Sequence, residues 1–194
     1  MALAMLVGCS YDFREIPAGH IGKVLTPTGW EQGIREAGQV DLKKKRADGT
    51  YNVLVLLEAT STTMKENFGQ AKQGGDGDDH RILTQDKVPL TVDIYTRAIV
   101  PEDEGIRNDI FAQITPQNTS DPRVRMITVN HIYGHFARMD VRGGTRAVFS
   151  RQSNVDKIMG NLDKLNTELQ NMVVKTFENN GVPLLVQNVQ VSNI

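Results

Sequence analysis

The sequence predicts a mixed α/β (α+β) fold, in which helices pack on one side of a curved mixed or antiparallel sheet. Three segments favour this class. From residue 88 to 98, apolar and polar side chains alternate, as in a strand between a core and water. Residues 53–57 are all apolar, which is typical of a strand covered on both faces. Residues 158–177 carry an apolar stripe at helical spacing, which a helix laid on a sheet requires.

The alternating segment also predicts which side chains enter the core. Thr84 to Lys87 forms a polar turn that leads into the strand. Val92 and Ile94 are expected in the core, whereas Asp93 is expected in water. The full set assigned to the core face is Val88, Leu90, Val92, Ile94, Thr96 and Ala98.

Turn and strand signals alternate through the first 60 residues. Pro17 and Gly19 predict a bend before a strand over 21–25. A second strand is expected over 37–42. Asp48-Gly49 is a hairpin turn signal before the apolar strand at 51–59.

Helix signals dominate after residue 100. Pro101 and three acids predict a helix start, with Ile106, Ile110 and Phe111 on its inner face. Residues 129–141 show helical spacing, and Gly143-Gly144 is expected to kink or break that helix.

The longest helix is expected near the end of the sequence. Asn154 to Asp156 should cap it, and Asn180-Gly181 should terminate it. A closing strand over 184–191 should carry Leu185, Val189 and Val191 on one face.

Composition excludes several classes of function. The 194 residues include 22 basic and 23 acidic side chains, a net charge of −1, so no overall field attracts nucleic acid. The only cysteine cannot form an intrachain disulfide. No apolar run reaches the roughly 18 residues that a spanning helix needs.

The cysteine lies where a lipid anchor would be attached. Residues 1–8 are almost wholly apolar, and Leu6 to Ser10 reads like the cleavage box of bacterial lipoproteins. In that box the thiol of Cys9 takes a diacylglyceryl group, whose fatty acyl chains are of the palmitate kind. Residues 1–15 are therefore expected to be a signal and lipid-anchor segment. The short apolar stretch without a basic start leaves open the alternative of a chance cysteine.

Several motifs together resemble the SPFH (band 7) superfamily of stomatins, prohibitins and flotillins. The Thr84-x-Asp86 turn and the strand after it match the middle of that domain, and residues 16–24 look like its opening strand. Arg142 and Arg146, the long helix and Gly181-Val182 before the last strand are similar to its end. The resemblance covers 16–194, and the long C-terminal helix usual in the family is absent from this sequence.

This resemblance implies a scaffold rather than an enzyme. A prohibitin-like lipoprotein member would associate with a membrane of the cell envelope, assemble into homo-oligomers and organise membrane proteins. In family members such assemblies often restrain a membrane protease, so modulation of proteolysis is expected. The alternative is a monomeric lipoprotein binding module of unrelated function. No nucleic acid and no cofactor is expected.

Two surface features are candidate membrane contacts. The basic run Lys43, Lys44, Lys45 and Arg46 could touch anionic lipid, or could be a solvated hairpin turn. Trp30 could dip into the interface, or could cap the core.

The polar face of the long helix is the candidate assembly face. It carries both signs of charge, including Lys164 and Glu168. Such a face suits lateral contacts between copies that salt would weaken.

Metal and catalytic signals are weak. His131 and His135 share one face of a helix, but a zinc site needs a third ligand. Residues 74–79 match one copy of a calcium nonapeptide, which cannot build a site alone. Surface histidines and an acidic loop are the preferred interpretations, so neither a metal site nor a catalytic site is predicted.

Overall fold

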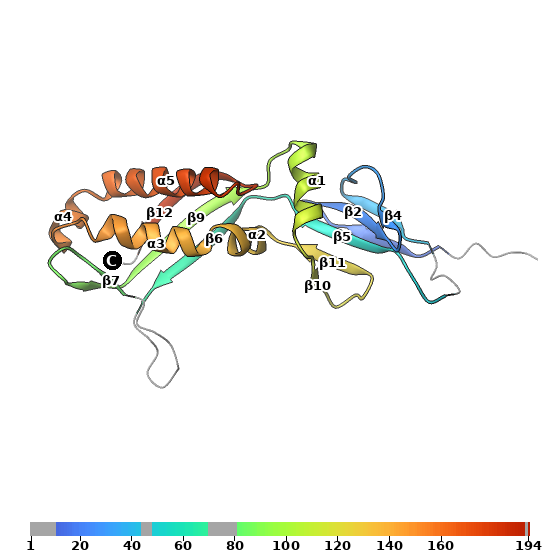
Figure 1. Cartoon of the computed structure of the whole chain (residues 1–194), viewed down its shortest axis with the longest axis horizontal. Helices are drawn as coiled ribbons and strands as arrows, with labels where there is room; N and C mark the ends of the chain where they lie inside the picture. The colour runs from blue at the N-terminus through green and yellow to red at the C-terminus, as the bar shows by residue number, and fades with distance from the viewer. Residues whose placement is uncertain (1–10, 44–47, 70–80, 193) are drawn as a thin grey trace, which may run out of the picture. The chain divides into compact units, whose positions relative to one another are not determined.

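The computed structural model describes residues 11–43, 48–69, 81–192 and 194 (Figure 1). The predicted mixed α/β class is confirmed. The range 16–194, treated above as one domain, contains two compact units. Unit 1 comprises the chain up to Thr60 together with Asp103–Thr128. Unit 2 comprises Ser61–Glu102 and Val129–Ile194.

Unit 1 is built on a five-stranded mixed sheet of order β10-β11-β5-β2-β3. The parallel pair β5–β11 joins distant parts of the chain, because Leu54 lies opposite Val124, and the other pairs are antiparallel. The predicted strands at 21–25 and 51–59 are confirmed. The strands are β2 (His20–Thr26), β3 (Gly29–Trp30), β5 (Val53–Glu58), β10 (Gln117–Asn118) and β11 (Val124–Ile127).

A two-stranded antiparallel ribbon covers part of this sheet. It consists of β1 (Phe13–Ile16) and β4 (Gly38–Asp41). The apolar residues of the ribbon and Leu42 just after it, together with those of β2 and β5, form one buried cluster: Ile16, Val24, Val40, Leu42, Leu54 and Leu56. The hairpin expected at Asp48-Gly49 is wrong, since β4 pairs with β1 and not with β5.

Helix α1 (Glu104–Gln113) completes unit 1, as the acidic start predicted. The Asp103 carboxylate accepts the Ile106 N–H at 2.9 Å, which caps the first turn. Ile110 and Phe111 are buried as expected.

Unit 2 is built on a three-stranded antiparallel sheet of order β12-β9-β6. The Thr84 turn is confirmed, because it closes the small hairpin β7–β8 and Thr84 Oγ1 accepts the Val88 N–H. The strands are β6 (Thr62–Phe68), β7 (Ile82–Leu83), β8 (Pro89–Leu90), β9 (Val92–Ile99) and β12 (Leu185–Ser192).

The predicted phase of β9 is correct on one face only. Val92, Ile94, Thr96 and Ala98 are buried. Asp93, expected in water, is only 4% exposed. It is buried because Lys65 Nζ lies 2.8 Å from its carboxylate and Asn67 Nδ2 donates to it at 2.6 Å.

Two residues at strand ends also differ from the prediction. Val88 was assigned to the core but is exposed, because the strand does not extend back through the turn. Leu185 is exposed, since a bulge between Val186 and Asn188 reverses the side-chain alternation before Val189.

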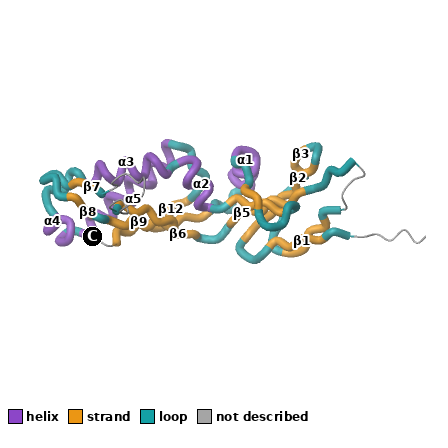
Figure 2. Tube along the Cα trace, turned by 90° about the horizontal axis from the view of Figure 1, so that it is seen from below, coloured by secondary structure: helices purple, strands orange, loops and turns teal. Residues whose placement is uncertain are grey.

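The helices of unit 2 are α2 (Val129–Phe136), α3 (Arg138–Phe149), α4 (Val155–Gly160) and α5 (Leu162–Asn179). Figure 2 shows α3 alongside the strands β6 and β9. Arg142 of α3 reaches over the ring of Phe68 in β6, 4.7 Å from guanidinium carbon to centroid. The buried stripe of α4 and α5 agrees with the prediction: Ile158, Leu165, Leu169, Val173 and Phe177.

The predicted helix breaks are misplaced. The first break falls at Ala137, and Gly143-Gly144 lies inside the continuous helix α3. A Cβ atom at Gly144 would lie 2.5 Å from Met172 Sδ of α5, so this glycine permits close helix packing. Asn154 caps the short helix α4 and not the longest helix, because Asn161 separates α4 from α5.

The sequence interpretation missed β6 and β11. In β6 the alternating buried positions are Met64, Glu66 and Phe68, and the acid at the centre disrupts the apolar pattern. β11 has four residues with an arginine among them, which is too short and polar for a strand signal.

Candidate functional site

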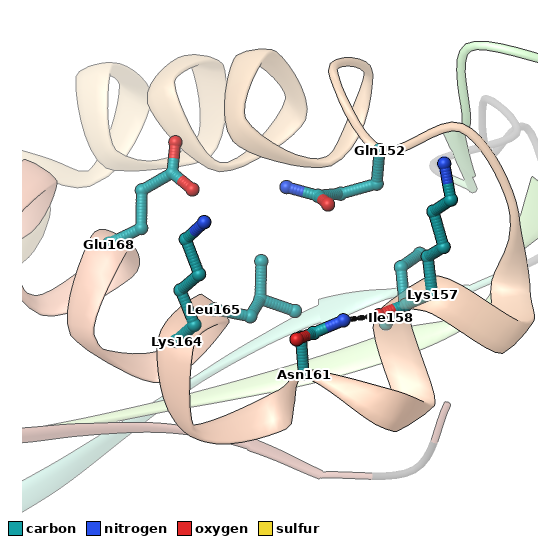
Figure 3. A pocket seen from close by; sticks show the side chains of 7 residues that line it. All are labelled: Gln152, Lys157, Ile158, Asn161, Lys164, Leu165 and Glu168. Atoms are coloured by element: carbon teal, nitrogen blue, oxygen red, sulfur yellow. Dashed lines mark hydrogen bonds between the residues drawn. The ribbon is translucent and has the colours of Figure 1, made fainter.

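A groove lies where α4 meets α5 in unit 2, and it contains both residues predicted for the assembly face. Its volume is about 250 Å³. Figure 3 shows Lys164 and Glu168 on α5, Lys157 on α4 and Gln152 on the turn after α3 around the opening. We call this the α4–α5 groove; its lining residues are Gln152, Lys157, Ile158, Asn161, Lys164, Leu165 and Glu168.

The helix break creates this groove. Asn161 ends α4, and its Nδ2 donates to the Lys157 carbonyl at 3.0 Å. A continuous helix would have left a convex surface with Lys164 and Glu168 on it. The sequence Gly160-Asn161 inside the apolar stripe was the signal that could have indicated a break.

The floor of the groove is apolar and its rim is charged. Ile158 and Leu165 are buried, whereas Lys157 and Lys164 are exposed. Glu168 contributes a carboxylate, and Arg151 Nη1 lies 3.7 Å from it. Cations therefore outnumber acids around the opening, which favours a partner that brings carboxylates.

Hydrogen bonds fix the neighbouring turn. The Gln85 N–H of the β7–β8 hairpin donates to the Gln152 carbonyl at 2.9 Å. The turn that begins at Thr84 therefore supports one wall of the groove.

A buried carboxylate forms a second charged cluster in unit 2. Glu66 of β6 is almost fully buried; Arg138 Nε lies 2.8 Å from it and Arg142 Nη1 2.5 Å. Tyr133 lies beside them, and burial, with a smaller effect of the Glu66 charge, raises the pKa of its hydroxyl far above the usual range. The phenol stays protonated at neutral pH. The two ion pairs to Glu66 hold α3 on β6.

The two histidines spaced four residues apart lie on the short helix α2. His131 is half-buried, and His135 is exposed with its ring edge against Phe136. Within the described ranges, no three His, Cys, Asp or Glu side chains gather as metal ligands.

Trp30 is half-buried in unit 1. Its ring centroid lies 5.6 Å from that of Phe111 in α1, and Lys23 Nζ lies 5.9 Å above the ring. This position agrees with the alternative in which the indole covers the core.

Several residues and segments singled out from the sequence lie outside the described residues. These are Cys9, the basic side chains Lys44, Lys45 and Arg46, and the acidic segment 74–79. Lys43 is described: its side chain is exposed, and its carbonyl accepts a hydrogen bond from Arg123 Nη2 at 2.9 Å.

Comparison with protein-family models and with curated proteins finds no match for this chain. In the described part of the molecule, no helix has the length and apolar character needed to cross a bilayer.

Proposed function

We propose that this protein is a membrane-associated oligomeric scaffold of the SPFH, prohibitin-like type. Cys9 carries the lipid anchor, and copies assemble side by side through the α4–α5 groove. The assembly organises other membrane proteins and restrains a membrane protease. The motifs at 16–24, 84–98 and 181–191 support the family resemblance.

The groove is the observation that carries this proposal. It combines an apolar floor with a mixed-charge rim, which suits a specific contact between proteins. Lys157 and Lys164 can receive carboxylates from a neighbouring copy, and Glu168 can receive a cation. The rim side chains lie outside the core, so they can be changed without removing buried packing.

Charge reversal on the rim tests the assembly. We expect Lys164→Glu and Glu168→Lys each to reduce the sedimentation coefficient of the detergent-extracted particle, because each places like charges across the contact. Sedimentation velocity and thermal melting by circular dichroism are measured together. Asp163→Lys is the matched control, since Asp163 lies on the same helix and outside the groove.

A core substitution separates assembly from folding. Leu165 is buried at the groove floor, so Leu165→Ala should lower the free energy of unfolding by roughly 2–5 kcal/mol. The rim reversals should leave the melting temperature nearly unchanged. Oligomers that resist both reversals would exclude the groove as the contact, and a wild-type chain that stays monomeric at high concentration would favour the binding-module alternative.

A further inference from the structure

Two exposed aromatic side chains lie on the outer face of the β1–β4 ribbon in unit 1. Tyr11 is 64% exposed and Phe13 is 51% exposed. Their ring centroids are 5.5 Å apart and the ring planes differ by 21°, so the rings are stacked. Water surrounds much of both rings, so their transfer to a less polar environment would lower the free energy.

The ribbon brings a basic side chain to the same end as these rings. Phe13 pairs with Asp41, and the Leu42 N–H donates to the Asp12 carbonyl at 3.0 Å, so pairing continues toward Tyr11 and Lys43. Lys43 is exposed, and the sequence stays basic through residue 46. Two acids share this outer face: Asp41, which lies opposite Phe13 and accepts the Lys43 N–H at 2.9 Å, and the exposed Glu15.

The inner face of the ribbon is firmly held, so its outer face can be altered without unfolding the unit. Ile16 and Val40 are buried in the core cluster. Arg14 Nε lies 2.5 Å from the Asp121 carboxylate, and Asp12 pairs with both Arg14 and Arg123. Phe13 therefore lies on a strand whose other face is fixed in the core, and Tyr11 precedes that strand.

Exposed aromatic rings at the same end of the ribbon as Lys43 fit one environment in particular, the headgroup layer of an anionic bilayer. Amphipathic rings concentrate at membrane interfaces. Each lysine close to an anionic surface adds about 1 kcal/mol of attraction. Two rings and one lysine give weak binding alone, which matches a role beside a lipid anchor.

We propose that Tyr11, Phe13 and Lys43 form a headgroup-level contact that holds the β1–β4 ribbon against an anionic bilayer. The inference rests on the proposed function, in which Cys9 supplies the lipid anchor. It reassigns the aromatic membrane contact from Trp30 to the ribbon.

A tryptophan reporter tests the contact in the full chain. Trp30→Phe with Phe13→Trp places the only tryptophan in the ribbon. Vesicles of phosphatidylcholine with phosphatidylglycerol, containing brominated lipid, are added to this chain and to its Cys9→Ser form. We expect the bilayer to protect the introduced indole from acrylamide, and brominated lipid to quench its emission, in both forms.

Binding of the unlipidated Cys9→Ser chain provides the quantitative arm. In vesicle co-sedimentation, Tyr11→Ser with Phe13→Ser should lower partitioning about tenfold, a change of 1.4 kcal/mol. Lys43→Glu should lower partitioning only on anionic vesicles. Met139→Ser is the control, because Met139 is 79% exposed in α3 of unit 2.

The outcomes separate this inference from the proposed function. Intact mass reports whether Cys9 carries lipid, independently of the ribbon. The contact is overturned if a membrane-bound chain leaves the ribbon indole unquenched, if the Cys9→Ser chain fails to bind anionic vesicles, or if the double serine variant binds like its parent. If that indole is quenched in a chain that never acquires lipid, the ribbon contact is supported and the proposed lipid anchor at Cys9 is contradicted.

Discussion

At the scale of single residues, the burial of Asp93 departs most from what the strand pattern predicts. It points away from Ile94 yet is buried, because Lys65 and Asn67 of β6 satisfy its carboxylate. A buried carboxylate with such partners stabilises the fold only while they remain.

We expect Asp93→Asn to lower the free energy of unfolding by roughly 1–3 kcal/mol, because Lys65 and Asn67 bind different carboxylate oxygens and an amide keeps only one of them. Ile94→Asp should cost more, above about 4 kcal/mol, because it buries a charge directly opposite Glu66. Urea titrations of both variants give the comparison. Equal losses would show that the assigned faces of β9 are wrong.

At the scale of elements, the close packing of α3 against α5 requires a glycine, with no side chain, at position 144. Gly144 faces Met172, whereas Gly143 has open space at its Cβ position. Close packing therefore requires glycine at 144, whereas no contact with a described residue requires it at 143.

Leucine substitutions distinguish the two glycines. Gly143→Leu should raise stability by up to about 1 kcal/mol, because leucine favours the helix more than glycine does. Gly144→Leu should lower stability by about 1–3 kcal/mol through overpacking against α5. Urea unfolding followed by circular dichroism measures both. In a Met172→Ala background the Gly144→Leu loss should shrink, and an unchanged loss would locate the clash elsewhere.

At the scale of the whole molecule, each compact unit is assembled from two separate stretches of chain. In unit 1 the parallel pairing of β5 with β11 brings the 121–123 loop to the ribbon. There Arg123 donates to the carbonyls of Leu42 and Asn52 at 3.0 and 3.1 Å. Arg123 also pairs with Asp12, 111 residues away in the sequence, so a network of charges closes the unit.

This network makes the stability of unit 1 sensitive to acid. The backbone N–H of Arg123, followed by the Arg14 side chain, holds the pKa of Asp121 below its ordinary value. A carboxyl whose pKa is lowered by folding stabilises the native state above its unfolded pKa, about 3.9, and that contribution is lost as pH falls through the lowered value.

We therefore expect unit 1 to lose stability as pH falls below about 4. Trp30 emission during urea unfolding reports this unit, because it contains the only tryptophan. Asp121→Asn should be less stable at neutral pH and should show a weaker dependence on acid. An acid dependence identical to that of the parent would rule out Asp121 as its source.

The sequence alone determined the elements whose signal is local. Each of these elements has a single sequence period that matches its burial. They are the alternating strand around Val92 and Ile94, the apolar run of β5 and the helical stripe from Leu165 to Phe177. Gly181 ends α5 as predicted, with φ of +60°, because this left-handed conformation strains other residues.

Only the tertiary structure decided the features that depend on partners distant in sequence. Glu66 and Asp93 are buried because arginine, lysine and asparagine side chains from other elements neutralise or bind them. Lys164 and Glu168 were named from the sequence as a helix face. They line a groove because the chain bends at Asn161 and Gln152 closes the opposite side. Local periodicity does not predict such contacts, because they depend on which distant segments pack together.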